Sequence, residues 1–297
     1  MNQTISLKKE TSRFTNKPSP FVKWAGGKRQ LINQMKVFFP ESFNKYIEPF
    51  VGGGAVFFHL LPKEARLSDS NLELINCYNV IKYNVKELIE SLSHHKYEEK
   101  YYYQIRVLDR DLEFYKKLSN IEKASRTIYL NKTGYNGLYR VNSKGYFNVP
   151  FGLHKNPTIC DKNNLLAVHL ALRDVKINRS PFKACMEYAK KNDFIYFDPP
   201  YHPISETSNF TSYNKSNFGK DSQNELYNVF KILDERGCKL LLSNSYSDYI
   251  LNLYKDYEII TLKARRSINS NANRRGFIKE VLIKNKFKFK NHQLIDY

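Results

Sequence analysis

Four consecutive residues combine groups that are suited to activating an amine. Asp198, Pro199, Pro200 and Tyr201 directly follow the apolar run 194–197. A carboxylate and a prolyl carbonyl can accept both hydrogens of an exocyclic amine, which draws its lone pair toward the geometry that attacks a methyl group. The prolines restrict the backbone, so these acceptors are placed in advance, and Tyr201 offers a flat face to an unstacked base. The tetrapeptide is also compatible with an ordinary turn after a strand.

A glycine-rich turn lies between two apolar segments nearer the start of the chain. The predicted order is a strand, the turn, a helix and a second strand that ends in an acid: 46–50, Gly52-Gly53-Gly54, 55–61, 65–69 and Asp69. This is the βαβ arrangement of a nucleotide-binding half-fold, in which the glycines let the backbone approach a ligand and the acid accepts hydrogen bonds from ribose. Taken alone, the turn also fits an ordinary connection between a strand and a helix.

A second pair of glycines lies among cationic and aromatic residues, in Lys23-Trp24-Ala25-Gly26-Gly27-Lys28. A phosphate-binding P-loop would require glycine at position 22 and Ser or Thr at position 29, where the chain has Val22 and Arg29. The sequence therefore argues against a triphosphate site here.

The charge of the chain is strongly positive and unevenly distributed. Its 297 residues include 48 basic and 29 acidic ones, a formal charge of +19. The stretch 124–160 has five basic residues and no acidic one, and 263–290 has ten basic residues beside Glu280. This excess favours nucleic acid as a partner, although such runs can also serve only to solubilise a surface. The four cysteines lack a C-x-x-C spacing, so we expect no zinc site and no disulfide framework.

Alternating strands and helices predict an α/β core that is interrupted by an inserted module. Further strands are predicted over 175–177, 194–197, 239–243, 258–262 and 277–283, and further helices from residue 71 and over 222–236 and 247–254. The stretch between residues 75 and 165 has helical segments without a clear buried strand. We therefore predict one domain made of residues 1–74 and 166–297, and an inserted domain, 75–165.

Together these motifs resemble those of the Dam-type DNA adenine-N6 methyltransferases (class alpha, D12), in which the glycine motif precedes the Asp-Pro-Pro-Tyr motif. The resemblance is carried by segments spread over most of the chain: 23–28, 48–57, 69–78, 135–152, 198–213 and 265–280. It implies a Rossmann-like, S-adenosylmethionine-dependent core with a seven-stranded sheet, and an inserted, mostly helical DNA-recognition domain that carries a β-hairpin. The implied reaction is methyl transfer to N6 of an adenine that is flipped out of duplex DNA.

The resemblance also implies which residues meet each ligand. The catalytic residues would be Asp198, Pro199, Pro200 and Tyr201. S-adenosylmethionine would be bound by Trp24, Ala25, Gly26, Lys28, Phe50, Gly52, Gly54, Asp69 and Asp198. Double-stranded DNA would be bound by Lys23, Tyr135, Asn136, Leu138, Arg140, Asn142, Pro150, Arg265 and Arg266.

The segment 135–152 resembles the recognition hairpin of the family, and Ser143-Lys144-Gly145 is a plausible turn between two extended runs. The resemblance implies that Tyr135 fills the gap left by the flipped adenine, whereas a position in a core is the alternative. Relatives with a similar hairpin target 5′-GATC-3′, which is the target we expect. Leu153 stands where a basic residue is expected in close relatives, and Lys155 is a nearby substitute.

Other classes of protein fit the sequence less well. Cytosine C5 methylation needs a nucleophilic cysteine, usually after a proline, and none of the cysteines follows one. Cytosine-N4 methylation usually has serine in place of Asp198, and methylation of an RNA amine stays open. A non-catalytic, basic DNA-binding subunit would keep the charge but need not keep Asp198, Tyr201, Asp69 and Gly54 together.

The sequence also carries expectations about the setting of the protein. Its beginning lacks the apolar core of a signal peptide, and no apolar stretch approaches the roughly 20 residues of a membrane span. We therefore expect a cytoplasmic monomer that binds no metal.

Overall fold

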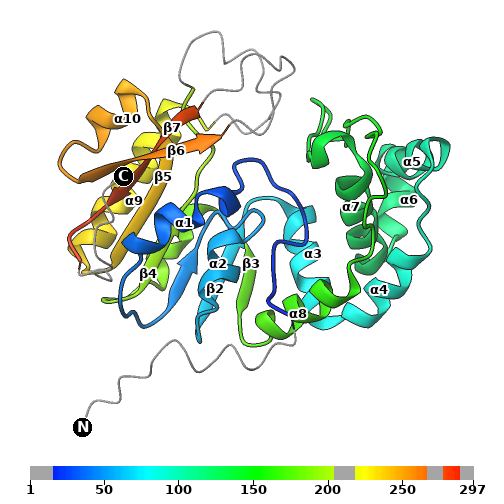
Figure 1. Cartoon of the computed structure of the whole chain (residues 1–297), viewed down its shortest axis with the longest axis horizontal. Coiled ribbons are helices and arrows are strands. Elements are labelled where there is room, and N and C mark those ends of the chain that lie inside the picture. The colour runs from blue at the N-terminus through cyan, green and yellow to red at the C-terminus, as the bar shows by residue number, and fades with distance from the viewer. Residues whose placement is uncertain (1–15, 204–217, 266–276, 288–297) are drawn as a thin grey trace.

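The protein is built on one seven-stranded sheet, as a computed structural model shows (Figure 1). The structure describes residues 16–203, 218–265 and 277–287. The strands run in the order β3-β2-β1-β4-β5-β7-β6, and β7 is antiparallel to both of its neighbours. Their bounds are β1 Tyr46–Glu48, β2 Ala65–Asp69, β3 Lys176–Arg179, β4 Phe194–Phe197, β5 Lys239–Ser245, β6 Glu258–Arg265 and β7 Phe277–Lys284. The α/β class and the seven-stranded sheet are confirmed.

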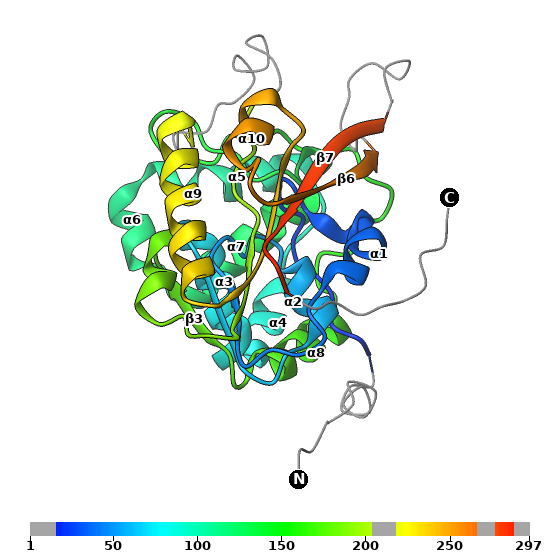
Figure 2. The same cartoon turned by 90° about the vertical axis from the view of Figure 1, so that its left-hand side faces the viewer.

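Each central strand is buried on both faces, because successive side chains point to opposite sides. Phe194 and Tyr196 of β4 belong to one apolar cluster, whereas Ile195 and Phe197 belong to another. The first cluster packs beneath α1 Ile32–Met35, α2 Ala55–Leu60, α3 Leu72–Tyr83, α4 Val85–Ser93 and α8 Lys162–Leu172. The second packs beneath η7 Phe182–Glu187, α9 Lys220–Glu235 and α10 Asp248–Leu253. Figure 2 shows α9 on one side of the sheet and α1 and α2 on the other.

A group of helices extends from the first face and is seen at the right in Figure 1. Its elements are α5 Glu99–Arg106, η5 Val107–Arg110, α6 Leu112–Lys117, α7 Asn120–Thr133 and η6 Tyr135–Gly137. Helix α7 begins at a capping box, in which Ser119 and Glu122 satisfy each other's backbone N–H groups. Its middle packs on the sheet side through Ala124 and Ile128, while Tyr129 and Leu130 enter a small separate cluster with Tyr102, Phe147 and Val149.

The division into residues 1–74 with 166–297 and 75–165 stays a proposal. The small cluster lies wholly within 75–165, but α3, α4 and α7 share the larger cluster with the sheet. Within the described part of the chain, no helix is both long enough and apolar enough to cross a membrane.

The strand order creates a crevice at the middle of the sheet. Strand β1 pairs with β2 on one side and with β4 on the other, so the chain leaves β1 and β4 toward opposite flanks. Ligands of open α/β sheets bind beyond the carboxyl ends of the strands at such a switch point. The glycine turn follows β1 and Asp198 follows β4, so the fold brings the two sequence motifs to one edge.

Candidate active site

Asp198 lies directly after β4 and is paired with a lysine from the start of the chain. The Lys28 ammonium lies 2.7 Å from Asp198 Oδ1, and the two side chains are 3% and 17% exposed. Lys28 Nζ also donates a hydrogen bond to the Gly26 carbonyl. Burial raises the pKa of Asp198 to about 6, although the charge of Lys28 opposes this shift. The Lys28 ammonium is the partner of Asp198 Oδ1 among the described residues. An ionised carboxylate has about four lone-pair sites, so Asp198 can still accept a hydrogen from a ligand.

The tetrapeptide is held by side chains from three other elements. Gln223 Nε2 of α9 donates to the Pro200 carbonyl over 3.1 Å, and Asn244 of β5 donates in turn to Gln223 Oε1 over 3.0 Å. Pro199 is buried and Pro200 is exposed. Among the described residues, none donates a hydrogen bond to the Pro199 carbonyl. The backbone is thus fixed while one prolyl carbonyl stays open beside Asp198.

The ring of Tyr201 is held at its hydroxyl and contacted over one face. Its hydroxyl donates to Glu280 Oε2 of β7 over 2.6 Å, and the Lys28 ammonium lies 4.7 Å from the ring centroid. Burial raises the pKa of Tyr201, so the phenol stays protonated and remains a donor at neutral pH. The structure thereby places a rigid aromatic face next to Asp198.

The glycine turn after β1 is folded around Asp69. The backbone N–H groups of Gly52 and Asn71 donate to its two carboxylate oxygens over 3.2 Å and 2.9 Å. Gly52 and Gly54 have φ values of 47° and 70°, a region that favours glycine. A Cβ at Gly52 would lie 2.9 Å from Trp24 Cδ1, so this turn tolerates no side chain at that position. Burial raises the pKa of Asp69, and these hydrogen bonds oppose the shift.

Aromatic side chains flank the turn. Phe50 stacks on Phe182 with ring centroids 5.3 Å apart and meets the edge of Phe218 at 5.6 Å. Trp24 lies on the other side and stacks on Tyr139 at 4.9 Å. Ala25 and Gly26 are exposed beside it. Flat apolar faces, an acid at the end of β2 and the Asp198 carboxylate suit the adenine, ribose and charged sulfur of S-adenosylmethionine.

The predicted DNA-binding residues come mostly from η6 and the hairpin after it. Tyr135 is 50% exposed, and its backbone N–H donates to the carbonyl of the exposed Pro150. Asn136 has a φ of 56° and is half-buried, and Leu138 packs against the small cluster. Lys23, from the cofactor segment, is exposed nearby and lies against Gly137. Tyr135 therefore does not occupy a core.

The hairpin itself is held by its own polar side chains. Arg140 Nε donates to Asn148 Oδ1 over 2.8 Å, and the Asn142 side chain accepts from the backbone of Lys144 and Tyr146. The predicted turn is present, with Gly145 at a φ of 86°, but the pairing of the flanking runs is limited to isolated bridges. Arg140 and Asn142 thus support the hairpin in this structure.

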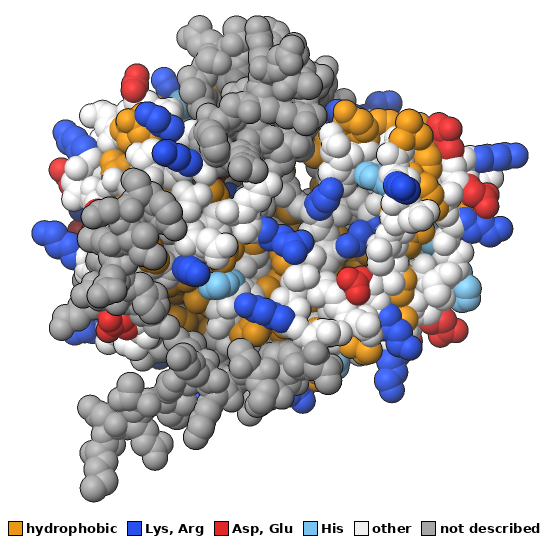
Figure 3. All heavy atoms as spheres, in the orientation of Figure 1, with side chains coloured by type: hydrophobic (Ala, Val, Ile, Leu, Met, Phe, Trp, Pro, Cys, Tyr) orange, Lys and Arg blue, Asp and Glu red, His pale blue; other side chains and the backbone are white. Residues whose placement is uncertain are grey.

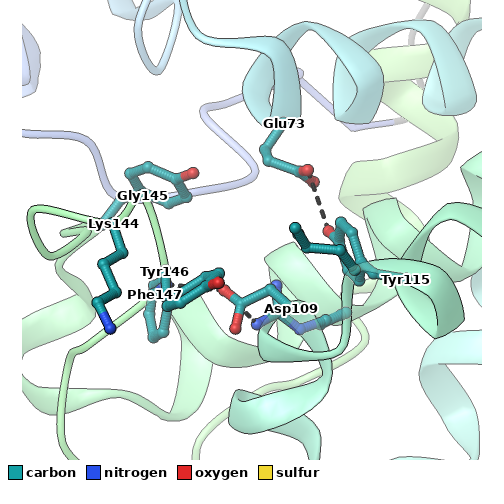
Figure 4. A pocket seen from close by; sticks show the side chains of 10 residues that line it. Glu73, Asp109, Tyr115, Lys144, Gly145, Tyr146 and Phe147 are labelled. Atoms are coloured by element: carbon teal, nitrogen blue, oxygen red, sulfur yellow. Dashed lines mark hydrogen bonds and ion pairs between the residues drawn. The ribbon is translucent and has the colours of Figure 1, made fainter.

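A polar pocket of about 170 Å³ lies behind this hairpin (Figure 4). Asp109 Oδ2 accepts from the Phe147 N–H over 2.7 Å and pairs with Arg126 at 2.9 Å. Tyr115 donates to Glu73 in the same pocket. Arg126 is 5% exposed, so one of the five basic residues of 124–160 supports the hairpin from inside and adds nothing to the basic surface. The Asp109 carboxylate compensates the charge of this guanidinium.

Other basic side chains remain on the surface. Figure 3 shows Lys and Arg side chains across the middle of one face, between the sheet and the helical part. Arg265 ends β6, but its side chain lies outside the described residues, as does the whole of Arg266. A search of the described residues finds no group of three or more potential metal ligands.

Sequence reasoning missed several residues of this site. Glu48 is buried beneath Asp198 and accepts from Tyr46 over 2.9 Å, and burial raises its pKa well above the usual range. A charge within the apolar run 46–50 was a usable signal. Glu280 had a signal too, as the sole acid of a basic stretch. Asn131 hydrogen-bonds to both Lys23 and Gly137, but no signal in the sequence marked it, because its role depends on tertiary contacts.

Comparison with known proteins agrees with this geometry. A type II methyltransferase, M1.LlaDCHI of Lactococcus lactis subsp. cremoris, is 44% identical over 90% of this chain and 95% of its own. A type II methyltransferase of Methanocaldococcus jannaschii, M.MjaIII, is also 44% identical, over 90% of this chain and 98% of its own. The DNA adenine methylase of Escherichia coli K12 is 35% identical over 88% and 93%. The model of the D12 class N6 adenine-specific DNA methyltransferases matches residues 24–268, and the chain belongs to this family.

Proposed function

We propose that this enzyme methylates N6 of an adenine within 5′-GATC-3′ and flips that adenine out of the duplex to do so. The observation that carries the proposal is the Asp198 carboxylate, which is held by the Lys28 ammonium, the same group that lies over the Tyr201 ring. An ionised carboxylate has about four lone-pair sites, so Asp198 can accept a further hydrogen from a ligand. An exocyclic amine offers such a donor.

As a member of the D12 class, the enzyme uses S-adenosylmethionine, which supplies a methyl group on a positively charged sulfur. The residues placed to hold this cofactor are Trp24 and Phe50 through their rings, Gly52 and Gly54 through the backbone, and Asp69 through hydrogen bonds. Lys28 holds the position of Asp198 from the same segment as Trp24.

The catalytic residues act by position and polarisation. Asp198 Oδ1 would accept one hydrogen of adenine N6 and the Pro199 carbonyl the other, which concentrates the lone pair on nitrogen. The pKa of about 6 leaves Asp198 ionised at neutral pH, the state that can accept. Tyr201, held by Glu280, would stack on the base and offset the cost of extrusion, about a few kcal/mol.

The exposed residues around η6 suit the duplex. Tyr135 is half exposed and could enter the gap left by an extruded base, and Lys23 lies against Gly137 of the same turn. The GATC target rests on the resemblance of the hairpin, and relatives include proteins called DNA adenine methylases. Phosphate contact follows from the positive charge and predicts that affinity for duplexes falls with salt.

Transfer of labelled methyl groups tests the proposal. The purified protein is incubated with three duplexes: one contains GATC, one has a single base pair of that site changed, and one has no adenine in the site. The products are then digested to nucleosides. We expect N6-methyladenine from the first duplex and at least about tenfold less from the others. N4-methylcytosine, or equal transfer to all three, would contradict the proposed substrate, and labelled RNA in place of DNA tests the RNA alternative.

A further inference from the structure

Asn131 joins the cofactor segment, residues 23–28, to the recognition turn, Tyr135–Gly137. It lies in α7 and is 2% exposed. Its Oδ1 accepts from the Lys23 N–H over 2.9 Å, while its Nδ2 donates to the Lys23 carbonyl over 2.9 Å and to the Gly137 carbonyl over 2.8 Å. A single side chain therefore satisfies backbone groups of two segments that lie far apart in sequence.

The two segments are also in direct contact. Gly137 has a φ of 66°, and a Cβ there would lie 2.6 Å from Lys23 Cδ, so the lysine side chain passes over the glycine. One residue further along the cofactor segment, Trp24 stacks on Tyr139 at 4.9 Å. The exposed end of Lys23 is thereby set at a defined distance from Tyr135, which begins the turn.

We propose that Asn131 is a positioning residue for sequence discrimination: it holds Lys23 in register with Tyr135–Gly137, so that both groups meet the same duplex correctly. The inference rests on the proposed function, in which Lys23 and Tyr135 contact DNA. Hydrogen bonds to base edges depend steeply on geometry, and a shift between two reading groups weakens the right sequence more than a wrong one. Only an amide offers this acceptor and these donors together, because a carboxylate cannot donate.

The chain contains a matched control for this role. Asn164 of α8 accepts from the Ser19 N–H over 2.9 Å and donates to the Ser19 carbonyl over 3.0 Å. Asn164 thus bonds the backbone of Ser19, four residues before Lys23, in the same way as Asn131 bonds the backbone of Lys23. No bond from Asn164 reaches the recognition turn in the described part of the chain. The two asparagines share the backbone pairing and differ in the bond to Gly137, in burial and in the Ser19 hydroxyl that also donates to Asn164.

The experiment compares Asn131→Asp with Asn164→Asp in the full chain. For each variant, kcat/KM is measured on the preferred duplex and on duplexes with one base pair of the site changed. The readout is kcat/KM on the preferred duplex divided by kcat/KM on the changed duplex. This ratio does not depend on the fraction of folded protein, so a merely structural defect leaves it unchanged. We expect the ratio to fall about tenfold in Asn131→Asp and to stay within about twofold of wild type in Asn164→Asp.

A second variant approaches the same junction without altering Asn131. Gly137→Ala adds a methyl group against Lys23 Cδ and should lower the ratio in the same direction. It also replaces the Asn131 variant as the readout if that protein does not fold. An unchanged ratio in the folded variants, or an equal fall in Asn164→Asp, overturns the inference. A wild-type protein without adenine methylation or without discrimination would instead refute the proposed function.

Discussion

The catalytic centre and the recognition hairpin are built in opposite ways. Asp198 follows a strand that is buried on both faces, and its neighbours are held by side chains from β5, β7 and α9. The hairpin has isolated bridges in place of a continuous ladder and depends on single side chains such as Asp109 and Asn148. Under the proposed function, the comparison teaches that the sheet prearranges the chemistry, whereas recognition would depend on a few polar contacts that can adapt to a duplex.

The largest expected effect comes from the catalytic side. Asp198→Ala removes the acceptor for the target amine, and we expect methyl transfer to fall at least about 10³-fold. Duplex affinity should stay within about threefold, because Asp198 is buried away from the basic surface. Labelled-methyl transfer and fluorescence anisotropy measure the two quantities, with Asp256→Ala as an exposed control. Transfer at a near wild-type rate would refute the role of Asp198.

A substitution at the proposed cofactor site should change the affinity for S-adenosylmethionine without changing the affinity for duplex DNA. Asp69→Asn keeps the size of the side chain but removes the charge that accepts from Gly52 and Asn71. We expect the affinity for S-adenosylmethionine to fall about 10- to 100-fold, the range for hydrogen bonds to a charged group. Calorimetry with the cofactor measures it, and duplex affinity serves as the internal control. A loss of duplex affinity of the same size would mean that the two regions are not separable.

Acid should weaken activity and strengthen the fold through the same carboxyl group. Because the pKa of Asp198 is raised to about 6, kcat/KM should fall about tenfold per pH unit below that value, as the protonated acid no longer accepts from N6. The folded state binds this proton more tightly than the unfolded state, so the contribution of Asp198 to the free energy of unfolding grows as pH falls from about 6 to about 4.

The pH-dependent contribution is isolated by comparing the cofactor-free wild type with Asp198→Asn. Urea unfolding is measured for both proteins across this pH range. Asp69, another buried acid, is common to both proteins and cancels in the difference. A difference that does not vary with pH would contradict the assigned shift.

On the recognition side, Tyr135→Ala should lower kcat/KM on duplex DNA about tenfold through the loss of base stacking. The free energy of unfolding should change by less than about 0.5 kcal/mol, because the ring is half exposed. Tyr83→Ala, which removes a 70% exposed tyrosine of α3, is the matched control. Equal kinetic effects in both variants would mean that Tyr135 has no special contact with DNA.

The smallest effect is expected where the chain departs from the family pattern. Leu153 is 95% exposed, so Leu153→Lys adds a charge to the recognition side without disturbing packing. We expect duplex affinity to rise a few-fold at low salt. The slope of the logarithm of the binding constant against the logarithm of the salt concentration should steepen by about one, for one more released counterion. Binding titrations over a range of salt concentrations measure both, and Leu153→Gln controls for the lost apolar surface. An unchanged slope would place residue 153 away from the phosphates.

The sequence was most informative where local pattern and long-range structure agree. All seven strands were predicted. Runs of apolar residues marked central strands such as β4 and β5, because strands buried on both faces need such runs whatever their neighbours are, whereas the mostly exposed edge strand β3 was predicted only as the short segment 175–177. The ends were less exact: β1 stops at Glu48, and β5 continues to Ser245. The pairing of Arg126 with Asp109 could not be predicted, because Asp109 lies in another helix and pairing across elements leaves no mark on a local charge count.

By itself, the sequence determined the strand set, the glycine turn with its acid, and the rigid Asp198–Tyr201 segment, since each depends on residues that are adjacent in the chain. Tertiary structure alone decided that Lys28 pairs with Asp198, that Glu280 orients Tyr201 and that Asn131 links Lys23 to Gly137. The physical reason is that a hydrogen bond needs its two atoms within about 3 Å, and only the folded chain brings such distant residues that close.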